Sequence, residues 1–538
     1  MKNNILISIL IFFLSLNLYS NESQIVVNVE PIEFEELGGL QSFAFAQYEG
    51  KWLIVGGRLD GLHRRQPFAA FDLAGNNNQI IVIDPVNKQK WSKNLSSLPV
   101  GIREQLSSTN MEFYQEGNYL YCIGGYGYSG IAGDHTTYAN LTAINVKETI
   151  EAIINGTSIV DNFRQIEDEK FQVTGGHLSK IGDRYYLLGG QKFIGRYNPM
   201  GPDHGPGFTQ EYTDAIRIFN INDDGKALTI EHLPSHTDKD NLHRRDYNAV
   251  EQIMPNGDEG VTMFSGVFRE DEDLPFLNSV DVSYDNYEVN NDFKQYYNHY
   301  HCPVLPLYSE SDNMMHTIFF GGIAQFYDNN GTLVQDDNVP FVNTIARVTR
   351  DENGNMTEYK MPSEMPALLG AGGEFIPNLN LSHYKNGVFK LDEITGNDIL
   401  IGYIYGGISS TAPNIFMVND GSQSIANNQI FEVYISTSTK SSVDEINESS
   451  ISDLKFNIYP NPSKKLINIE YELKNNDNVR ISITDGEGKL IDDIYLKDQT
   501  IGKHSYTKTI KGLVNGSIYF LTIETSNEIE TRKLVIER

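Results

Sequence analysis

The sequence predicts an all-β protein with a large repeated region and a small, separate C-terminal unit. Three observations lead to this prediction. Tyr, Phe and Gly are abundant, at 30, 27 and 46 residues, which is typical of strands joined by tight turns. Six apolar segments each end on a glycine pair or on Ser-Gly. The composition then changes after about residue 439, where a Ser-rich acidic stretch begins.

The composition also limits the class of protein. The 538 residues include 42 Lys and Arg against 71 Asp and Glu, a formal net charge of −29. A nucleic-acid-binding protein needs a basic surface, so nucleic acid is excluded as a partner. Hydrophobic residues make up 40% of the chain, which is enough to build cores and argues against broad disorder.

Residues 1–20, "MKNNILISILIFFLSLNLYS", are predicted to be a secretory signal peptide. A lysine precedes an apolar run from Ile5 to Leu16, and small and polar residues follow, so cleavage is expected near Ser20. A membrane anchor is the alternative, but the run is short for a bilayer and lacks a basic flank. No later segment is apolar enough to span, so the mature chain is not expected to cross a membrane.

The repeat is seen in strands that close on glycine. The six segments end at Gly57, Gly125, Gly190, Gly266, Gly322 and Gly407. A hairpin turn and another strand precede each one, as in "MEFYQEGNYLYCIGG". A third and a fourth strand follow in most units, as in "AIRIFNI" and "ALTIEHLP". The prediction is therefore six antiparallel units of four strands.

Residues 24–439 resemble a kelch-type β-propeller, the fold of galactose oxidase and kelch-like proteins, with six blades. The sixth unit supplies only three strands before the linker, while the N-terminus carries an extra one. We therefore predict that Val27–Phe34 pairs with Ile430–Ser436 and closes the ring, which leaves no long unpaired edge.

One face of the predicted propeller carries the long connections. The turns between the first and second strands are short, whereas the connections between the second and third strands are long, as in "QKFIGRYNPMGPDHGPGFTQEY". Long loops on a rigid scaffold are a common way of building a binding site. The inner strands begin at the same face, so their first residues are candidates for a site at the mouth of the central channel. These candidates are Arg103, Glu104, His177, His243, Arg244, Arg245, Asp246, His299, His301 and Glu374.

The segment "YNHYHC", Tyr297–Cys302, allows two interpretations. His-x-His on a strand places both rings on one side, as a metal site requires, and copper-radical oxidases share the kelch-type propeller. Cys302, however, adjoins His301 rather than facing a candidate tyrosine, and hydrogen bonding at a polar mouth also explains the histidines. Oxygen-rich turns such as "NINDDG" lack calcium-loop spacing. We predict no metal, no cofactor and no disulfide between Cys122 and Cys302.

Two functions remain open at this stage. The first is a surface module that binds glycan or protein ligands through the long-loop face. The second is a sugar enzyme, because six-bladed kelch propellers include exported mutarotases that act on sialic acid with Arg and acid groups at the channel mouth. Arg244 or Arg245 beside Asp246 suits a carboxylate, and Glu374 or a histidine could move a proton. At most one of the two arginines is expected to face the channel, because neighbours alternate along a strand.

Residues 440–453 are predicted to be a linker, and residues 454–538 a small β-sandwich. This last segment resembles the type A C-terminal sorting domain of the type IX secretion system of Bacteroidota. Its most specific motif is "YPNPS", which comprises Tyr459, Pro460, Asn461, Pro462 and Ser463. The resemblance implies recognition by the type IX machinery after periplasmic transit, followed by surface attachment or release. Acidic and basic residues balance within 451–538, so the net negative charge belongs to the repeated region.

Overall fold

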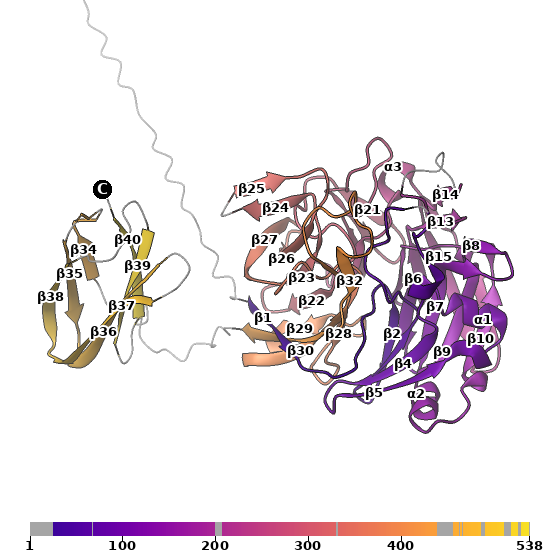
Figure 1. The fold of residues 1–538 in the computed structure, drawn as a ribbon, viewed down its shortest axis with the longest axis horizontal. Coiled ribbons are helices and arrows are strands. Elements are labelled where there is room, and N and C mark those ends of the chain that lie inside the picture. The colour runs from indigo at the N-terminus through magenta and orange to yellow at the C-terminus, as the bar shows by residue number, and fades with distance from the viewer. Residues whose placement is uncertain are drawn as a thin grey trace, which may run out of the picture. The chain divides into compact units, whose positions relative to one another are not determined.

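The computed structural model describes residues 25–66, 68–199, 207–329, 332–437, 456–461, 463–464, 466–485, 490–509, 518–525 and 529–536. The predicted signal peptide and linker, and Pro462 of the sorting motif, lie outside these residues. The described residues confirm an all-β protein, with sheets built almost wholly from antiparallel pairs (Figure 1). The chain divides into two compact units after Thr439.

In the first unit, six sheets each contain four antiparallel strands that lie side by side. The first three comprise β2 Ala44–Tyr48, β3 Lys51–Val55, β4 Gln79–Asp84 and β5 Gln89–Asn94; β6 Thr109–Glu116, β7 Tyr119–Ser129, β9 Asn140–Asn145 and β10 Phe163–Glu167; β11 His177–Ile181, β12 Arg184–Leu188, β15 Ala215–Asp223 and β16 Leu228–His232. The next two comprise β18 Asn248–Ile253, β19 Glu259–Phe264, β20 Ser279–Val282 and β21 Tyr287–Asn290; β22 Val304–Ser309, β23 Met314–Ile323, β26 Phe341–Arg350 and β27 Met356–Glu364.

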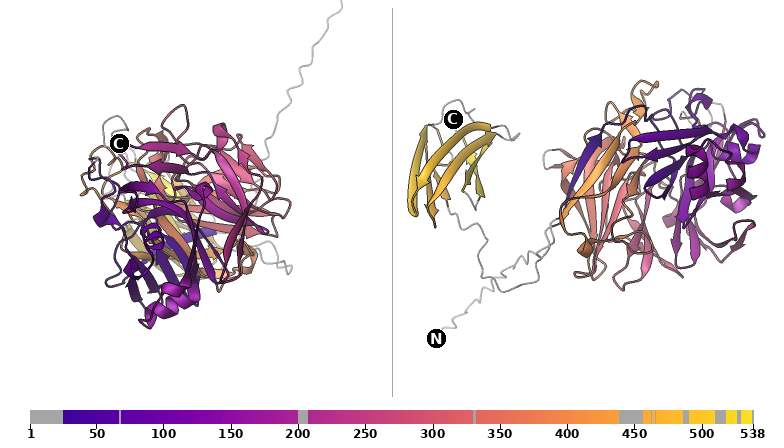
Figure 2. Two further views of the ribbon diagram at one scale, coloured as in Figure 1. Left: turned by 90° about the vertical axis from the view of Figure 1, so that its right-hand side faces the viewer. Right: turned by 90° about the horizontal axis from the view of Figure 1, so that it is seen from below.

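The sixth sheet joins the two ends of the first unit. It contains β28 Gly373–Pro377, β30 Gly396–Gly406 and β33 Ile430–Thr437, and its fourth strand is β1 Ile25–Ile32. The register pairs Ile25 with Thr437 and Ile32 with Ile430, so the predicted pairing of the ends is confirmed, although β1 stops two residues before Phe34. Figures 1 and 2 show the indigo β1 beside the orange strands of the sixth sheet.

The glycine pairs explain how neighbouring sheets pack. Gly124 has a φ of 63°, and a Cβ built on it would lie 1.9 Å from the carbonyl oxygen of Val173, which leads into the next sheet. The adjacent Gly125 donates its N–H to that same oxygen at 2.9 Å. Gly407 repeats this contact from the last sheet to the first, donating to Leu40 O at 2.9 Å. Only glycine allows so close an approach in this conformation.

A closed cycle of six backbone hydrogen bonds links the segments that precede the inner strands. Each member donates its N–H to the carbonyl of the member from the preceding sheet, and the first donates to the last, at 2.7 to 3.4 Å. The six members are Ser42, Asn110, Gly175, Asp246, His301 and Gly372. All except His301 have φ between 50° and 69°. We call these residues the backbone ring. It ties all six sheets to one another at one level.

The long connections carry short strands of their own, as do a few other segments. These strands are β8 Asp134–Thr137, β13 Gln191–Ile194, β14 Thr209–Tyr212, β17 His236–Thr237, β24 Phe326–Asn329, β25 Thr332–Gln335, β29 Phe389–Lys390, β31 Ile408–Ser410 and β32 Ser424–Ala426. The helices are α1 Val100–Gln105, α2 Val146–Ile154 and α3 Lys239–Leu242, with single 3₁₀ turns at Leu73–Gly75, Leu95–Ser97, Val160–Asn162, Glu169–Phe171 and Leu391–Glu393. The helices were not predicted.

The second unit contains two antiparallel sheets around one hydrophobic core. One sheet orders β34 Phe456–Tyr459, β35 Leu466–Leu473 and β38 Gly502–Thr509, and the other orders β37 Leu490–Gln499, β36 Asp477–Asp485, β39 Ile518–Glu524 and β40 Ile529–Val535. Asn461 and Ser463 of the sorting motif join its first strand to its last. Asn461 donates from Nδ2 to Lys533 O at 2.7 Å and accepts from Val535 N, and Ser463 N donates to Val535 O.

Two further predictions are tested by these residues. Cys122 and Cys302 are both buried and unbridged, as predicted. None of the helices in the described ranges is both long and apolar enough to cross a membrane.

Candidate functional site: a pocket above the backbone ring

The long connections of the first unit surround a cavity of about 480 Å³. Every one of the six sheets contributes to its wall, through Phe71, Tyr126, Tyr197, Phe268, Ile323 and Phe416, taken in sheet order. Each of these residues lies in, or at the edge of, a connection between the second and third strands of its sheet. The loops that the sequence marked as unusually long are therefore the loops that build the cavity, which we call the upper pocket.

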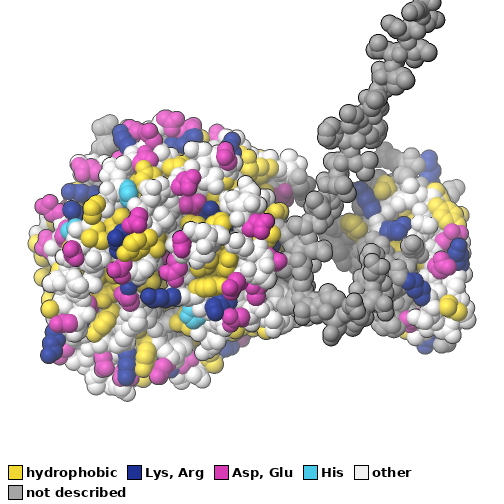
Figure 3. Space-filling model, turned by 180° about the vertical axis from the view of Figure 1, so that it is seen from behind, with side chains coloured by type: hydrophobic (Ala, Val, Ile, Leu, Met, Phe, Trp, Pro, Cys, Tyr) yellow, Lys and Arg dark blue, Asp and Glu magenta, His cyan; other side chains and the backbone are white. Residues whose placement is uncertain are grey.

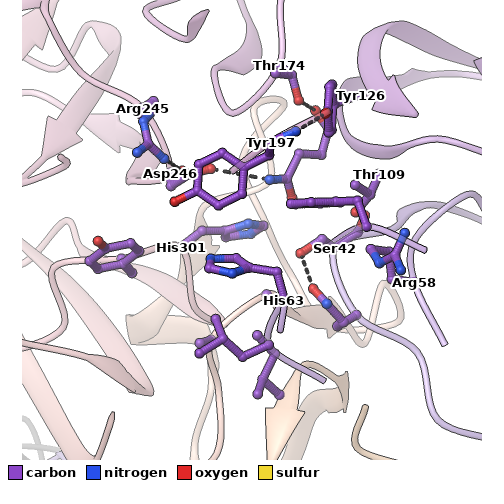
Figure 4. Close-up of a pocket in the computed structure, with 18 of the residues that line it drawn as sticks. Ser42, Arg58, His63, Thr109, Tyr126, Thr174, Tyr197, Arg245, Asp246 and His301 are labelled. Atoms are coloured by element: carbon purple, nitrogen blue, oxygen red, sulfur yellow. Dashed lines mark hydrogen bonds and ion pairs between the residues drawn. The ribbon is translucent and has the colours of Figure 1, made fainter. Parts of the chain in front are cut away.

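The backbone ring forms the floor of the upper pocket. Ser42, Asn110, Asp246, His301 and Gly372 all line it from below. Positive φ values at all of these residues except His301 turn the chain sharply just before the inner strands. Figure 4 shows Ser42, Asp246 and His301 converging on the pocket from different parts of the chain.

Arg245 is the best-placed cation in the pocket. Its Nε donates to Tyr212 Oη at 3.0 Å, its Nη1 pairs with Asp246, and its guanidinium lies 5.2 Å from the centre of the Phe268 ring. Among the described residues, none accepts a hydrogen bond from Nη2. A guanidinium held in this way presents a fixed donor to a ligand oxygen.

Aromatic rings make up much of the wall around this cation. Tyr197, Phe268 and Tyr300 line the pocket together with His63, whose ring lies 4.9 Å from that of Tyr197. Burial, reinforced by the charge of Arg245, lowers the pKa of His63 to about 4, so its imidazole is neutral near pH 7. Figure 4 shows the rings of His63, Tyr197 and His301 directed toward the middle of the pocket.

The charge of the pocket is opposite in sign to that of the chain. Three arginines, Arg58, Arg65 and Arg245, line it, against one carboxylate, Asp246. Arg58 is already bonded to Asp60 at 2.7 and 2.6 Å and to Asn76 at 2.8 Å. The net charge of the whole chain is −29, and Asp and Glu side chains are spread over the surface seen in Figure 3. A positive pocket in an acidic protein favours an anionic ligand.

A second, much smaller cavity of about 60 Å³ lies on the other side of the backbone ring. Ser42, Asn110, Asp246 and His301 line both cavities, and Glu112, His177 and Glu374 line only this lower one. Burial raises the pKa of Glu112 to about 8, although Gly176 N donates to one carboxylate oxygen at 2.7 Å. Burial, together with the charge of His301, lowers the pKa of His177 to about 3.

Half of the ten candidate residues predicted from the sequence meet at these two cavities. Arg245, Asp246 and His301 line the upper pocket, and His177, Asp246, His301 and Glu374 line the lower cavity. The Nε2 atom of His301 lies 3.1 Å from Oε1 of Glu374, which makes an ion pair when the imidazole is protonated. These five residues, drawn from four different sheets, lie close together around the backbone ring.

Arg244 does not belong to that cluster. Its side chain is fully buried. Its guanidinium donates to the carbonyl oxygens of Asn241, Ser265 and Asn278 at 2.7, 2.7 and 3.0 Å. It also lies 4.2 Å from the centre of the Phe276 ring. The prediction of Arg244 as a ligand contact is wrong, because every side of this guanidinium is used to hold loops together.

Four other candidates also lie outside both cavities. Arg103 and Glu104 lie in α1, where Glu104 accepts from Ser129 Oγ at 2.9 Å. His243 is 2.7 Å from Asp214 Oδ1 and stacks on Tyr212. His299 is buried and bonded at both ring nitrogens, to Gln295 O at 2.9 Å and to Gln325 N at 3.0 Å.

The separation of His299 from His301 also bears on a metal site. Residues 298–301 are not a strand, since β22 begins at Val304, so the two rings do not share a side. Among the described residues, no group of three His, Cys, Asp or Glu side chains is placed to hold a metal ion.

Several residues of the pocket were missed by the sequence analysis. They are the aromatic residues of the long connections, the ring residues Ser42 and Asn110, and Glu112 on an inner strand. Tyr300 lies within the segment "YNHYHC" that the sequence analysis discussed, but only its histidines were chosen. Each long loop contains at least one aromatic residue, arginine or apolar residue, and this is the signal from which the pocket wall could have been predicted.

The two histidines of this segment are expected to affect stability with opposite pH dependence. Burial lowers the pKa of His301, but the negative charges of Glu374 and then Asp246 raise it by more. The net pKa therefore lies above its ordinary value. The contribution of His301 is therefore complete below that ordinary value and is lost as the pH rises through the raised pKa. Burial lowers the pKa of His299 to about 4, so its contribution is present at higher pH and is lost as the pH falls toward that value.

Chemical unfolding of two variants at about pH 5 and about pH 9 tests this. His301→Ala should cost about 1 kcal/mol or less, because the ion pair is partly exposed, and the cost should be smaller at high pH. His299→Ala should cost more at high pH than at low pH. Equal pH trends for both variants would show that the assigned contacts are wrong.

Residues 457–537 match the family model described as "Secretion system C-terminal sorting domain". The C-terminal unit is a type IX sorting domain. This confirms the sequence prediction for that part of the chain, and it supports export with secretion or attachment at the outer surface. No curated protein matches the chain.

Solved structures resemble the chain only weakly. "Structure of YjhT" has 11% identity and a TM-score of 0.39, and the match covers 74% of this chain and 98% of that one. A "Novel fungal alcohol oxidase with catalytic diversity among the AA5 family, in complex with copper" has 9% identity and a TM-score of 0.37, and covers 95% and 100%. Similarity this low supports no assignment of activity.

Proposed function

We propose that residues 25–437 form a six-bladed, kelch-like β-propeller and that residues 456–536 form the sorting β-sandwich. Three observations support the propeller: six sheets that each contain four neighbouring antiparallel strands, the pairing of β1 with β33, and the closed backbone ring. The function proposed for the propeller is to bind a small acidic sugar in the upper pocket, outside the cell, after export directed by the sorting domain.

The shape of the pocket favours a small ligand over a protein surface. A cavity of about 480 Å³ lies within the usual range for small-molecule sites. A protein partner would instead bury about 800 Å² of a broad surface. One sugar residue has apolar C–H faces as well as hydroxyls, so it suits a wall of aromatic rings with a few polar groups.

The observation that carries the proposal is Arg245, whose Nη2 lies among aromatic rings and has no acceptor within the described part of the chain. Its Nη2 atom can donate to a carboxylate oxygen, while Tyr197, Phe268 and Tyr300 surround the sugar ring. Asn110 and Thr174 lie on the floor and wall and offer hydrogen bonds to hydroxyl groups. An acidic sugar uses each of these features, whereas a neutral sugar would leave the positive charge of Arg245 without a partner in the ligand.

A glycan array probed with the full mature chain tests the proposal. We expect binding to glycans that carry a carboxylate sugar, and loss of that binding when the carboxylate is reduced to an alcohol or esterified. Binding to the neutral derivatives with equal strength would remove Arg245 from the account. No binding to any acidic glycan would contradict the proposed function.

A mutarotase-like sugar enzyme is the second candidate. The ion pair of His301 and Glu374 at 3.1 Å favours it, because a proton donor and acceptor lie together just below the pocket floor. The test is the rate at which a freshly dissolved anomer of the bound sugar equilibrates, followed by NMR. Acceleration by the wild type that is lost in His301→Ala, with binding retained, would establish catalysis; an unchanged rate would leave binding alone.

A further inference from the structure

The floor of the upper pocket is closed, and this limits how a glycan chain can enter. The backbone ring is a complete cycle of six N–H to carbonyl bonds, so no gap between neighbouring sheets opens at this level. A backbone cycle that also joins six sheets cannot widen without losing hydrogen bonds across the whole unit. The floor is therefore a fixed part of the fold.

Side chains of the backbone ring are held by contacts with one another and with neighbouring residues. Asn110 Nδ2 donates to Asp246 Oδ1 at 3.3 Å. This bond joins two members of the cycle that are separated by Gly175. On the other side His301 extends to Glu374 at 3.1 Å. Asp246 is held in turn by Arg245, so the polar groups at the centre hold one another in place.

The space beneath the ring is too small to continue the site. The lower cavity has a volume of about 60 Å³. A water molecule takes up about 30 Å³ of liquid, so this cavity suits water and excludes a sugar ring. Its walls combine Glu112, Glu374 and His177 with apolar and aromatic side chains such as Met111 and Phe113, so its small volume, rather than its polarity, excludes a sugar.

The open side of the upper pocket lies at the long connections. Arg65 and Met417 both line the pocket and are exposed, and the side chain of Met417 is 67% exposed. These two loops are fixed to each other, since Arg65 N donates to Asn419 O at 2.9 Å and Asp60 pairs with Ile425. A ligand therefore enters past this rim and stops at the backbone ring.

We propose that the upper pocket takes only the terminal residue of an acidic glycan and does not accept a residue from the middle of a chain. This inference rests on the proposed function and narrows it. A mid-chain residue has a neighbour on both sides, and the backbone ring that closes the floor of the pocket leaves the second neighbour no path through the fold. The rest of the glycan would lie outside the rim.

Matched pairs of glycans test this inference with the full mature chain. In each pair the same carboxylate sugar is either terminal or capped by one neutral sugar. We expect capping to weaken binding at least tenfold for every acidic sugar that binds. Arg184→Ala serves as the control variant, because Arg184 lies at the short turn between β11 and β12, bonded to Asp285, and should keep the same preference.

The possible results separate the two proposals. Equal binding of terminal and capped sugars would overturn terminal recognition and leave the proposed function intact. Absence of binding to both members of all pairs would overturn both. A preference for terminal sugars that persists in Arg245→Gln, with unchanged affinity, would place the binding site elsewhere and would also overturn the inference.

Discussion

Replacing Arg244 by alanine is expected to lower the free energy of unfolding by about 3–5 kcal/mol. Arg244 is fully buried, and burial lowers the pKa of its guanidinium to about 9. Its guanidinium donates hydrogen bonds to three backbone carbonyl oxygens, those of Asn241, Ser265 and Asn278. The alanine variant leaves these oxygens without that donor and adds a cavity beside Phe276.

The neighbouring residue provides a matched comparison. Arg245→Ala removes the same kind of side chain from the pocket wall, where the guanidinium bonds Tyr212 and Asp246 but no further described residue. We expect this variant to unfold within about 1–2 kcal/mol of the wild type. Urea unfolding of both variants measures the two free energies of unfolding and so distinguishes a structural arginine from one that lines the pocket. If Arg245→Ala is the more destabilised of the two, the roles assigned to the pair are reversed.

Deleting residues 454–538 is expected to abolish appearance of the protein at the cell surface and in the medium. The family match covers 457–537, and the second unit has its own hydrophobic core, separate from the sheets of the first. Loss of the sorting domain should therefore leave the first unit folded but held in the periplasm. Among the described residues, no strand from beyond Thr437 pairs with a strand of the six sheets.

Cell fractionation of the truncated protein measures this, and protease resistance of the periplasmic fraction shows whether the first unit has folded. Asn461→Ala in the full chain is a milder variant, since it removes both side-chain bonds to the last strand, β40. Normal surface display of the truncated protein would contradict the role given to the sorting domain.

The fold was predictable because its strongest signals are local. Each glycine pair follows an apolar strand directly, and the structure shows why: a Cβ at Gly124 or Gly321 would lie within about 2 Å of a carbonyl oxygen of the next sheet, at 1.9 and 2.1 Å. The pairing of the chain ends was also predictable, since the count of strands in the last unit was one short. The helix α2 was not, because it replaces an ordinary turn between β9 and β10.

The site was only partly predictable because alternation fails where the chain is irregular. The segments before the inner strands contain Asp246 and Asn298 at φ of 50° and 59°, so successive side chains there do not alternate as in a strand. His299 is therefore bonded inward while His301 reaches the pocket. For the arginines, the expectation that at most one faces the channel was correct, but only the structure shows that it is Arg245.

The aromatic wall was hidden for a different reason. Phe71, Tyr126, Tyr197 and Phe268 are separated by up to about two hundred residues, and they meet only because six loops converge above one ring. No spacing within one loop indicates such a meeting. Loop length indicated the face on which the upper pocket lies, but not the side chains that line it.

The most direct test of the central claim is calorimetric titration of the full mature chain with the acidic glycan that binds best on the array. The wild type should bind, and Arg245→Gln should bind about 10–100-fold more weakly, the loss expected for a hydrogen bond to a charged group. Arg184→Ala should match the wild type. Unchanged affinity in Arg245→Gln would contradict the claim that the upper pocket is an acidic-sugar site.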